Sequence, residues 1–291
     1  MTLSRHQLKQ LASFLALYLI WGSTYFAISV AVAEWPPFLM AGVRFVLAGL
    51  LMYGYLRWRG AANPSLAELK GAAILGVLMP AIGNGFVTLA QKEVSSGVAA
   101  LVVATVPLFA ILFARLFGHK PRRMDLAGVL LGIAGIVVLN MGANLQASPA
   151  GAAALLFASA GWALGSAWSR HLTQPKGLMS SAMMMLSGGI VLLLGSVASG
   201  EQLVAIPSWH GWLAMLYLAI FGSLIAYTAY MFLLQNVSAA AATSYAYVNP
   251  VIAVLLGVWL LGEHIGPAEL LSMTIILAGV VLIGWKKAPR S

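Results

Sequence analysis

Cysteine is absent from this chain of 291 residues, and charged residues make up only 8% of it. Without cysteine the chain cannot form disulfide bonds, zinc–thiolate sites or thiol nucleophiles. Soluble domains carry about 25% charged residues, so there is too little polar surface here to cover a globule in water. Because 61% of the residues are hydrophobic, we expect a lipid bilayer to be the main solvent of the folded chain.

Motifs of several other functional classes are also missing. The sequence has no H-E-x-x-H or G-x-S-x-G motif and no paired aspartates within an apolar run, so it gives no reason to expect a metal or a cofactor. No ring of charges or filter-like motif indicates a channel. An intramembrane enzyme and a channel therefore stay as less favoured alternatives. The net charge of +9 comes from short basic clusters between apolar runs, so no nucleic-acid partner is expected.

Apolar runs predict ten membrane-spanning helices, since about 20 apolar residues cross the roughly 30 Å hydrocarbon core of a bilayer. The first uncharged run, residues 10–33, exceeds the 7–15 residues of a signal-peptide core and is expected to be retained. The fold class is therefore all-α, a polytopic membrane protein. The ten helices are predicted between residues 9 and 34, 38 and 56, 70 and 92, 93 and 115, 125 and 140, 149 and 170, 178 and 199, 201 and 235, 236 and 263, and 267 and 285.

Fourteen of the sixteen Lys and Arg residues fall on one side of this topology. Cytoplasmic loops carry an excess of Lys and Arg, so we expect that side to be cytoplasmic, together with both chain termini. Lys92 falls on the other side, and Arg44 falls within a span. The fourteen are Arg5, Lys9, Arg57, Arg59, Lys70, Arg115, Lys120, Arg122, Arg123, Arg170, Lys176, Lys286, Lys287 and Arg290.

An internal duplication organises the chain. Val94 lies thirteen positions before Pro107, and Val237 lies thirteen positions before Pro250, with small residues at the start of both segments. Pro250 marks the division between that small-residue half and a more hydrophobic half of its span. We therefore predict two five-helix repeats, residues 1–145 and 146–291.

Five is an odd number, so the second repeat must enter the membrane from the opposite side. The repeats are then inverted, which is typical of secondary transporters whose central site opens alternately to either face. Pro107 and Pro250 are the predicted hinges, because proline disturbs the helical hydrogen-bond ladder. The first, third, fourth, sixth, eighth and ninth helices are expected to surround a mostly apolar central cavity.

These features resemble the EamA-type branch of the drug/metabolite transporter superfamily over essentially the whole chain. One departure is Gly118-His119, where the family often has Gly-Glu, so a symmetrical role for Glu263 in the second repeat is not implied. The matching pieces are Trp21-Gly22-Ser23, Arg44-Phe45, the small-residue segments before the two prolines, Gly262-Glu263, and the Ala-Gly pairs at 134–135 and 278–279.

The resemblance implies export of small amphiphilic metabolites through the central cavity, in the inner (plasma) membrane of a bacterium. Bacterial exporters of aromatic amino acids are the first comparison, so amino acids with aromatic or large neutral side chains are the expected cargo. A broad-specificity drug/metabolite carrier, or a carrier of sugar- or nucleotide-type solutes, is the alternative. The expected partners are the small-molecule substrate and the lipid bilayer, and the chain is expected to be a monomer or a homodimer.

Arg44 is the only basic residue predicted well inside a span. A charge at the bilayer centre costs roughly 2.5–3.5 kcal/mol on insertion scales, which makes Arg44 a candidate anchor for a substrate carboxylate. The alternative is a structural arginine that is satisfied by helix-end carbonyls or that extends toward the interface.

Aromatic and polar side chains at membrane depth are the other candidates for the cavity wall. Trp21 and Trp162 lie near mid-span, away from the interfacial belt, and could stack on an aromatic or apolar solute; tight helix packing is the alternative. Hydroxyl and amide groups could orient a polar solute or form interhelical hydrogen bonds. With Trp21, Trp162 and Arg44, the predicted cavity residues are Tyr25, Asn84, Thr105, Ser166, Tyr227, Tyr230, Tyr245 and Asn249.

All carboxylates are predicted near helix ends or in loops. Proton-coupled carriers commonly keep a carboxylate or histidine at mid-membrane depth, and none is predicted there. We therefore expect a facilitator or a weakly coupled exporter, with Glu263 as the only candidate for a coupling role. The seven carboxylates are Glu34, Glu68, Glu93, Asp125, Glu201, Glu263 and Glu269.

Overall fold

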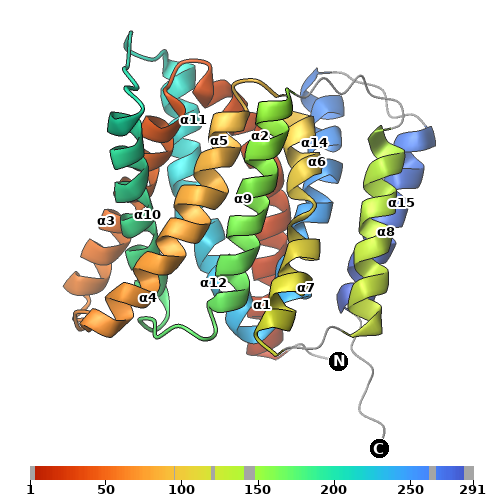
Figure 1. Ribbon diagram of the computed structural model, residues 1–291, viewed down its shortest axis with the longest axis horizontal. Helices are drawn as coiled ribbons and strands as arrows, with labels where there is room; N and C mark the ends of the chain where they lie inside the picture. The colour runs from red at the N-terminus through yellow and green to blue at the C-terminus, as the bar shows by residue number, and fades with distance from the viewer. Residues whose placement is uncertain (1–3, 95, 119–121, 141–147, 262–266, 285–291) are drawn as a thin grey trace, which may run out of the picture.

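The computed structural model describes residues 4–94, 96–118, 122–140, 148–261 and 267–284, and within these ranges it contains helices and no strand. Figure 1 shows the helices running side by side. Six continuous helical stretches are long and apolar enough to cross a membrane, which confirms the predicted all-α polytopic architecture. They are Arg5–Val32, Pro37–Trp58, Leu66–Ala90, Pro149–Trp168, Leu178–Ala198 and Trp209–Asn236.

Three of these spans contain a π-helical stretch, labelled η, and the other predicted spans are present as shorter helices. The first span consists of α1 (Arg5–Ala16), η1 (Leu17–Trp21) and α2 (Gly22–Val32). The third span consists of α4 (Leu66–Gly76), η2 (Val77–Asn84) and α5 (Gly85–Ala90). The eighth span consists of α11 (Trp209–Tyr217), η3 (Leu218–Ile225) and α12 (Ala226–Asn236). The second, sixth and seventh spans are α3 (Pro37–Trp58), α9 (Pro149–Trp168) and α10 (Leu178–Ala198). The remaining spans are α6 (Ser96–Val103) with α7 (Val106–Leu116), α8 (Arg123–Asn140), α13 (Ala239–Ala242) with α14 (Tyr245–Leu261), and α15 (Pro267–Gly284).

Successive spans alternate in direction, so the loops gather at two ends of the molecule (Figure 1). We call one the acidic end, because its loops at 33–36, 91–94 and 199–208 carry Glu34, Glu93 and Glu201. We call the other the basic end, because its loops at 59–65 and 169–177 carry Arg59, Arg170 and Lys176. Helix α1 begins and helix α15 ends at the basic end.

Three carboxylates hold helix N-termini together at the acidic end. Glu34 accepts hydrogen bonds from the backbone N–H and the hydroxyl of Ser208, the N-cap residue of α11, and these bonds lower the pKa of Glu34. Glu93 accepts a 2.6 Å bond from Ser148, the N-cap residue of α9. Glu201 accepts bonds of 3.1 and 2.8 Å from two backbone N–H groups in the first turn of α3. The first turn of a helix has free N–H groups and a positive dipole end. Glu201 accepts directly from such N–H groups, whereas Glu34 and Glu93 bond to the serines that cap α11 and α9. Each carboxylate thereby joins two parts of the chain.

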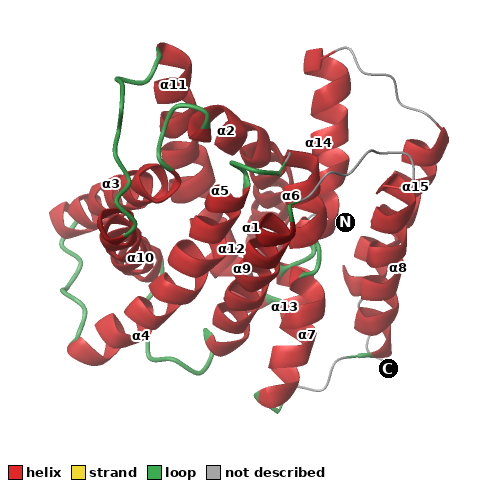
Figure 2. Ribbon diagram, turned by 45° about the horizontal axis from the view of Figure 1, so that its top comes forward, coloured by secondary structure: helices red, strands yellow, loops and turns green. Residues whose placement is uncertain are grey.

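Two helix pairs form opposite edges of the molecule, with the other six spans grouped between them (Figures 1 and 2). Helix α3 packs on α10 at one edge, and α8 packs on α15 at the other. Both contacts depend on glycine: a Cβ at Gly189 would lie 2.8 Å from the backbone nitrogen of Val46, and a Cβ at Gly279 would lie 2.7 Å from the carbonyl oxygen of Gly128. Small residues allow helices in a membrane to approach this closely. The central group consists of the six spans that the sequence predicts around a cavity.

The helix contacts recur in a pattern that relates the first five spans to the last five. Helix α9 of the sixth span packs on η2 of the third, and α2 of the first span packs on α11 of the eighth. The first span runs from the basic to the acidic end, whereas the sixth runs the opposite way. The predicted repeat boundary between residues 145 and 146 lies outside the described residues.

The fourth and ninth spans are interrupted close to their prolines, but not at them. Turn residues 104–105 separate α6 from α7, and residues 243–244 separate α13 from α14. Pro107 lies in the first turn of α7, where a missing N–H costs little. Pro250 lies inside α14, and the helix continues through it, so the interruption at residues 243–244 comes before the change of composition at Pro250. The ladder is still weakened at Pro250, because proline has no N–H to donate to the carbonyl of Ala246.

Candidate functional site

A cavity of about 50 Å³ lies within the central group of helices. Its wall comes from the first, third, fourth, sixth and ninth spans, whereas the eighth span contributes side chains only behind the wall. Pockets that hold drug-sized ligands measure about 300–1,000 Å³, so the cavity is contracted in this conformation. The lining residues are Trp21, Thr24, Tyr25, Ile28, Gly83, Asn84, Val87, Val103, Val106, Ala158, Ser159, Trp162, Tyr245 and Asn249.

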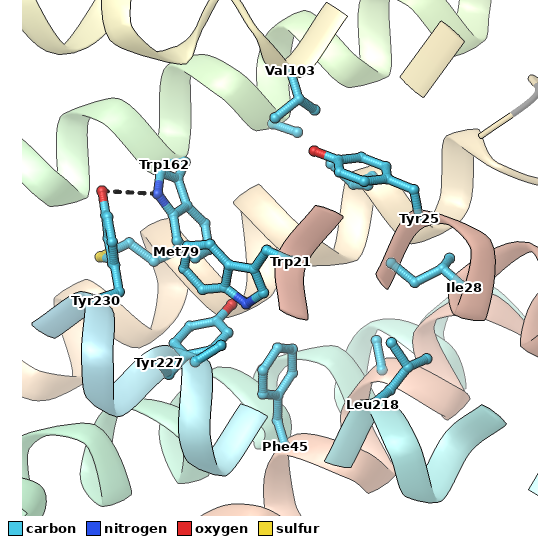
Figure 3. Packing of buried hydrophobic residues seen from close by; sticks show 14 of the residues in the cluster. Trp21, Tyr25, Ile28, Phe45, Met79, Val103, Trp162, Leu218, Tyr227 and Tyr230 are labelled. Atoms are coloured by element: carbon cyan, nitrogen blue, oxygen red, sulfur yellow. Dashed lines mark hydrogen bonds between the residues drawn. The ribbon is translucent and has the colours of Figure 1, made fainter. Parts of the chain in front are cut away.

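Five buried aromatic side chains from four spans close the cavity toward the basic end. Trp21 is at the centre of this aromatic cluster, with ring centroids 5.3 Å from Trp162, 5.5 Å from Tyr227, 5.2 Å from Tyr230 and 4.6 Å from Tyr245. Figure 3 shows Trp21 and Trp162 converging with Tyr227 and Tyr230, which both lie on α12. Most of these ring pairs meet edge to face or tilted, which are favourable geometries for aromatic rings. The two predicted tryptophans thus meet at the base of the cavity.

Hydrogen bonds fix the polar atoms of this aromatic cluster. Trp21 donates from Nε1 to the carbonyl of Gly222 at 3.0 Å. Trp162 donates from Nε1 to the Tyr230 hydroxyl at 3.1 Å (Figure 3), and that hydroxyl also lies 2.6 Å from the Ser166 hydroxyl. By contrast, the buried Tyr227 hydroxyl has no hydrogen-bond partner within the described part of the chain.

The π-helical stretches place several of these groups. η1 ends at Trp21, η2 ends at Asn84, and η3 contains Gly222, whose carbonyl accepts from Trp21. A π turn widens the helix and shifts the side chains that follow, and such turns are frequent at functional sites. Pro80 within η2 is one local cause, because proline cannot complete an α-helical ladder. The other two stretches contain no proline, and they carry no obvious sequence signal.

Three polar side chains line the cavity one turn nearer the acidic end. Asn84 lies on the third span, Ser159 on the sixth and Asn249 on the ninth. The Ser159 hydroxyl is buried and has no hydrogen-bond partner among the described residues. The side-chain amide of Asn249 is also buried and makes no hydrogen bond of ordinary geometry there, although the Tyr25 hydroxyl lies close enough to interact with it. Buried polar groups are normally satisfied, so the Ser159 hydroxyl in particular is available to a solute. No group of three His, Asp or Glu residues in the described ranges could hold a metal ion.

Arg44 lies directly behind Asn84. Its side chain is only 2% exposed, and Nη2 donates to Oδ1 of Asn84 at 2.6 Å. The guanidinium carbon lies 4.4 Å from the centroid of the Phe45 ring. Arg44 therefore does not line the cavity itself, but it acts on the cavity wall through Asn84.

The structure brings most of the predicted site residues to one place. Trp21, Tyr25, Asn84, Trp162, Tyr245 and Asn249 line the cavity, whereas Arg44, Ser166, Tyr227 and Tyr230 lie behind its wall. Thr105 is not among the lining residues, and its hydroxyl donates to the carbonyl of Val102 beside the interruption of the fourth span. Glu263 lies outside the described residues.

Two polar lining residues were missed by the sequence reasoning. Thr24 lies three positions after Trp21, and Ser159 lies three positions before Trp162. Residues three apart share one face of a helix, so the tryptophan positions were a usable signal for both.

Comparisons with known proteins agree on one family. The family model described as "EamA-like transporter family" matches residues 9–141 and 149–285. The chain is 51% identical over 280 residues to the protein named "Uncharacterized inner membrane transporter YedA" from Escherichia coli (strain K12), covering 96% of this chain and 92% of that relative.

More distant relatives extend the similarity. The chain is 29% identical over 273 residues to "Protein PecM" from Dickeya dadantii (strain 3937), covering 91% of this chain and 88% of that relative. A solved crystal structure superposes with a TM-score of 0.79 at 24% identity, covering 95% of this chain and 98% of the other. This last likeness concerns the fold alone.

The two tyrosines behind the cavity provide a matched test of the hydrogen-bond assignment. Tyr230→Phe removes bonds to Trp162 and Ser166, each worth about 1 kcal/mol, so its unfolding temperature in detergent should fall by roughly 2–4 °C. Tyr227→Phe removes a hydroxyl without a partner among the described residues and should leave the unfolding temperature unchanged or slightly higher. Equal losses in both variants would contradict this arrangement.

Proposed function

The chain belongs to the EamA-like transporter family, and on that basis we propose that it is a secondary transporter that exports small amphiphilic metabolites by alternating access. Amino acids with aromatic or large neutral side chains are the proposed cargo. The observation that carries this proposal is a central cavity with an aromatic base and polar groups on its wall, among them Asn84, Ser159 and Asn249, which suits a solute with one apolar part and one compact polar part.

The packing of the spans supports alternating access. The sixth span meets the third as the first meets the eighth, and the first and sixth spans run in opposite directions. Such contacts are expected when two five-helix repeats cross the membrane in opposite orientations and surround a shared site. The contracted cavity is then an intermediate state of the cycle, in which the aromatic cluster blocks the path to the basic end.

The distribution of carboxylates supports transport without strong proton coupling. Among the described residues, no Asp or Glu lines the cavity, and Glu34, Glu93 and Glu201 bond to groups at helix N-termini at the acidic end. A carboxylate engaged in capping is poorly placed to carry a proton through the centre of the membrane. The carrier is therefore proposed to be a facilitator or a weakly coupled exporter.

The basic end is proposed to face the cytoplasm of a bacterium, with the protein in the inner membrane. This orientation follows the excess of Lys and Arg expected in cytoplasmic loops, and the relative from Escherichia coli is named an inner membrane transporter. The proposed partners are the solute and the surrounding lipid, with the chain as a monomer or homodimer.

Bending during the cycle is proposed to occur where the fourth and ninth spans are weakened. Interruptions at residues 104–105 and 243–244 lie close to Pro107 and Pro250. The freed carbonyl of Ala246 lowers the energy needed to bend α14, because no hydrogen bond to Pro250 has to be broken.

Solute exchange in liposomes tests the function. Purified protein reconstituted with a mixture of unlabelled amino acids inside should take up labelled phenylalanine, tryptophan or leucine saturably, without an imposed pH gradient. Trp162→Ala should slow this exchange about tenfold or more, whereas Phe157→Ala, on the outer side of the same helix and 52% exposed, should not. Strict dependence on a pH gradient would overturn the facilitator proposal, and no exchange of any amino acid would overturn the proposed cargo.

The lack of cysteine allows a clean test of orientation. Single cysteines can be placed at exposed loop positions, Gln202→Cys at the acidic end and Ala62→Cys at the basic end. A membrane-impermeant maleimide should label Gln202→Cys in intact cells and Ala62→Cys only after permeabilisation. The reverse pattern would show that the basic end faces outward.

Pro250→Ala tests the proposed bending point. The new N–H can bond to the carbonyl of Ala246, so α14 becomes stiffer and exchange should slow by about fivefold, as expected for one hydrogen bond of about 1 kcal/mol. Pro149→Ala, at the first position of α9, is the control and should leave the rate unchanged. An unchanged rate in Pro250→Ala would remove the reason to place bending there.

A further inference from the structure

Arg44 is a buried cation without a carboxylate partner in the described part of the chain. A salt bridge in that part of the chain joins Arg122 and Asp125 at the start of α8 and does not involve Arg44. Nε and Nη1 of Arg44 have no hydrogen-bond partner among the described residues, so its main polar contact is the bond from Nη2 to Asn84. A buried charge is costly unless it is compensated, and a positive potential therefore surrounds this part of the cavity wall.

The bond to Arg44 fixes which way the Asn84 amide points. A guanidinium group can only donate hydrogen bonds, so the atom of Asn84 that faces it at 2.6 Å must be the oxygen. The Thr88 hydroxyl lies 3.4 Å from the same oxygen and donates to the backbone carbonyl of Asn84 at 2.9 Å. The amide is thereby held in one orientation, with its nitrogen on the other side.

The amide nitrogen of Asn84 is consequently a fixed donor at the cavity. Asn84 lines the cavity, and its bonds within the described chain involve only its oxygen atoms. A charge-assisted bond of 2.6 Å is strong, and it polarises the amide so that the N–H groups become better donors. A solute oxygen that meets Asn84 receives a hydrogen bond and a favourable potential from Arg44.

The other polar groups on the cavity wall do not create a preference for negatively charged solutes. The Ser159 hydroxyl lacks a partner among the described residues, and the Asn249 amide has only the Tyr25 hydroxyl close to it there; each of these groups can donate or accept. Within the described ranges, no carboxylate lines the cavity to attract a cationic group. The Thr24 hydroxyl is also held in one direction, because it donates to the carbonyl of Trp21 at 2.7 Å. Asn84 is the lining group that bonds to a charged side chain, and it therefore favours negative charge and disfavours positive charge.

We propose that Arg44 and Asn84 form a recognition pair that makes the carrier selective for solutes with a carboxylate. Asn84 binds a carboxylate oxygen directly, and Arg44 is a positioning residue that orients and polarises the Asn84 amide. Zwitterionic amino acids and simple carboxylic acids enter, whereas organic cations of the same shape are rejected. This inference rests on the proposed carrier function and narrows its substrate class.

Matched solutes test the selectivity directly. The unfolding temperature of the purified protein is measured with the twenty amino acids, with the amide of each, and with 3-phenylpropionate, since a ligand of the native state raises it. At least one amino acid should stabilise the protein at a concentration about tenfold or more below that needed for its amide, which keeps the ammonium but lacks the carboxylate. Equal stabilisation by the amide, or none by any carboxylate, would overturn the proposal.

Asn84→Asp tests the residue in direct contact with the solute. Aspartate can pair with Arg44, which cancels the charge and replaces the donor by an acceptor, so carboxylates should bind about tenfold or more weakly while the amides bind better. Asn236→Asp makes the same change at the exposed end of α12, where Asn236 bonds only to the carbonyl of Phe232, and should keep the wild-type preference. A wild-type preference in Asn84→Asp would contradict the role of Asn84.

Two changes at Arg44 separate positioning from simple structural support. Arg44→Gln lets the Asn84 amide turn either way, so the preference for a carboxylate over its amide should fall to near unity. Arg44→Lys keeps a donor and a positive charge, and it should restore most of that preference. If Arg44→Lys loses the preference while remaining as stable as wild type, Arg44 does not act through its charge on Asn84.

Liposome exchange separates failure of this inference from failure of the carrier function. Saturable exchange of cationic or uncharged solutes, with no preference for carboxylates, would leave the protein a carrier and overturn the recognition pair. Absence of exchange by every solute, with carboxylate-selective stabilisation intact, would instead count against transport.

Discussion

The hydrogen bond between Arg44 and Asn84 is the interaction around which the site is arranged. It joins the second span, which forms an outer edge with α10, to the third span, which lines the cavity. The guanidinium group of Arg44 is buried, and the chain supplies an amide oxygen and an aromatic ring beside it. The cost of burying an incompletely paired cation is acceptable where the charge serves the site, as intramembrane charges commonly do. Asn84, Ser159 and Asn249 are among the amide and hydroxyl groups that line the cavity.

Charged and neutral polar groups occupy different parts of the molecule, because a charge is most stable where it can be solvated. At the acidic end, Glu34, Glu93 and Glu201 bond to helix N-termini or to the serines that cap them, so these carboxylates stabilise the fold from outside the apolar layer. Within the described part of that layer, neutral groups dominate and bond mainly to one another or to backbone carbonyls. Hydroxyl and amide groups cost far less to bury than ionised carboxylates, so the chain can place polar side chains within the apolar layer with few charges.

Much of this arrangement could be predicted from the sequence, and the misses have physical causes. Charge-free runs located the spans because apolar length is a strong constraint in lipid, and mid-span tryptophans located the base of the cavity. The interruption of the ninth span at residues 243–244 was not predicted, because proline lowers the cost of bending but does not set where tertiary contacts interrupt a helix. Thr105 was expected at the cavity, yet its hydroxyl satisfies the backbone at a helix interruption. The direct contact of Arg44 with Asn84 joins residues forty positions apart, and no periodicity in one chain reveals such a pair.

The π-helical stretches have a consequence for how such a site can change. A π turn corresponds to one residue inserted into an α-helix, so everything beyond it is rotated by about 100° relative to a regular helix. Loss of one residue between positions 218 and 225 would let that span revert to α geometry and would turn Tyr227 and Tyr230 away from Trp21 together. Single-residue insertions and deletions usually disrupt a membrane helix. In these π-helical stretches, one such change would rotate the side chains that follow and so alter the shape of the cavity.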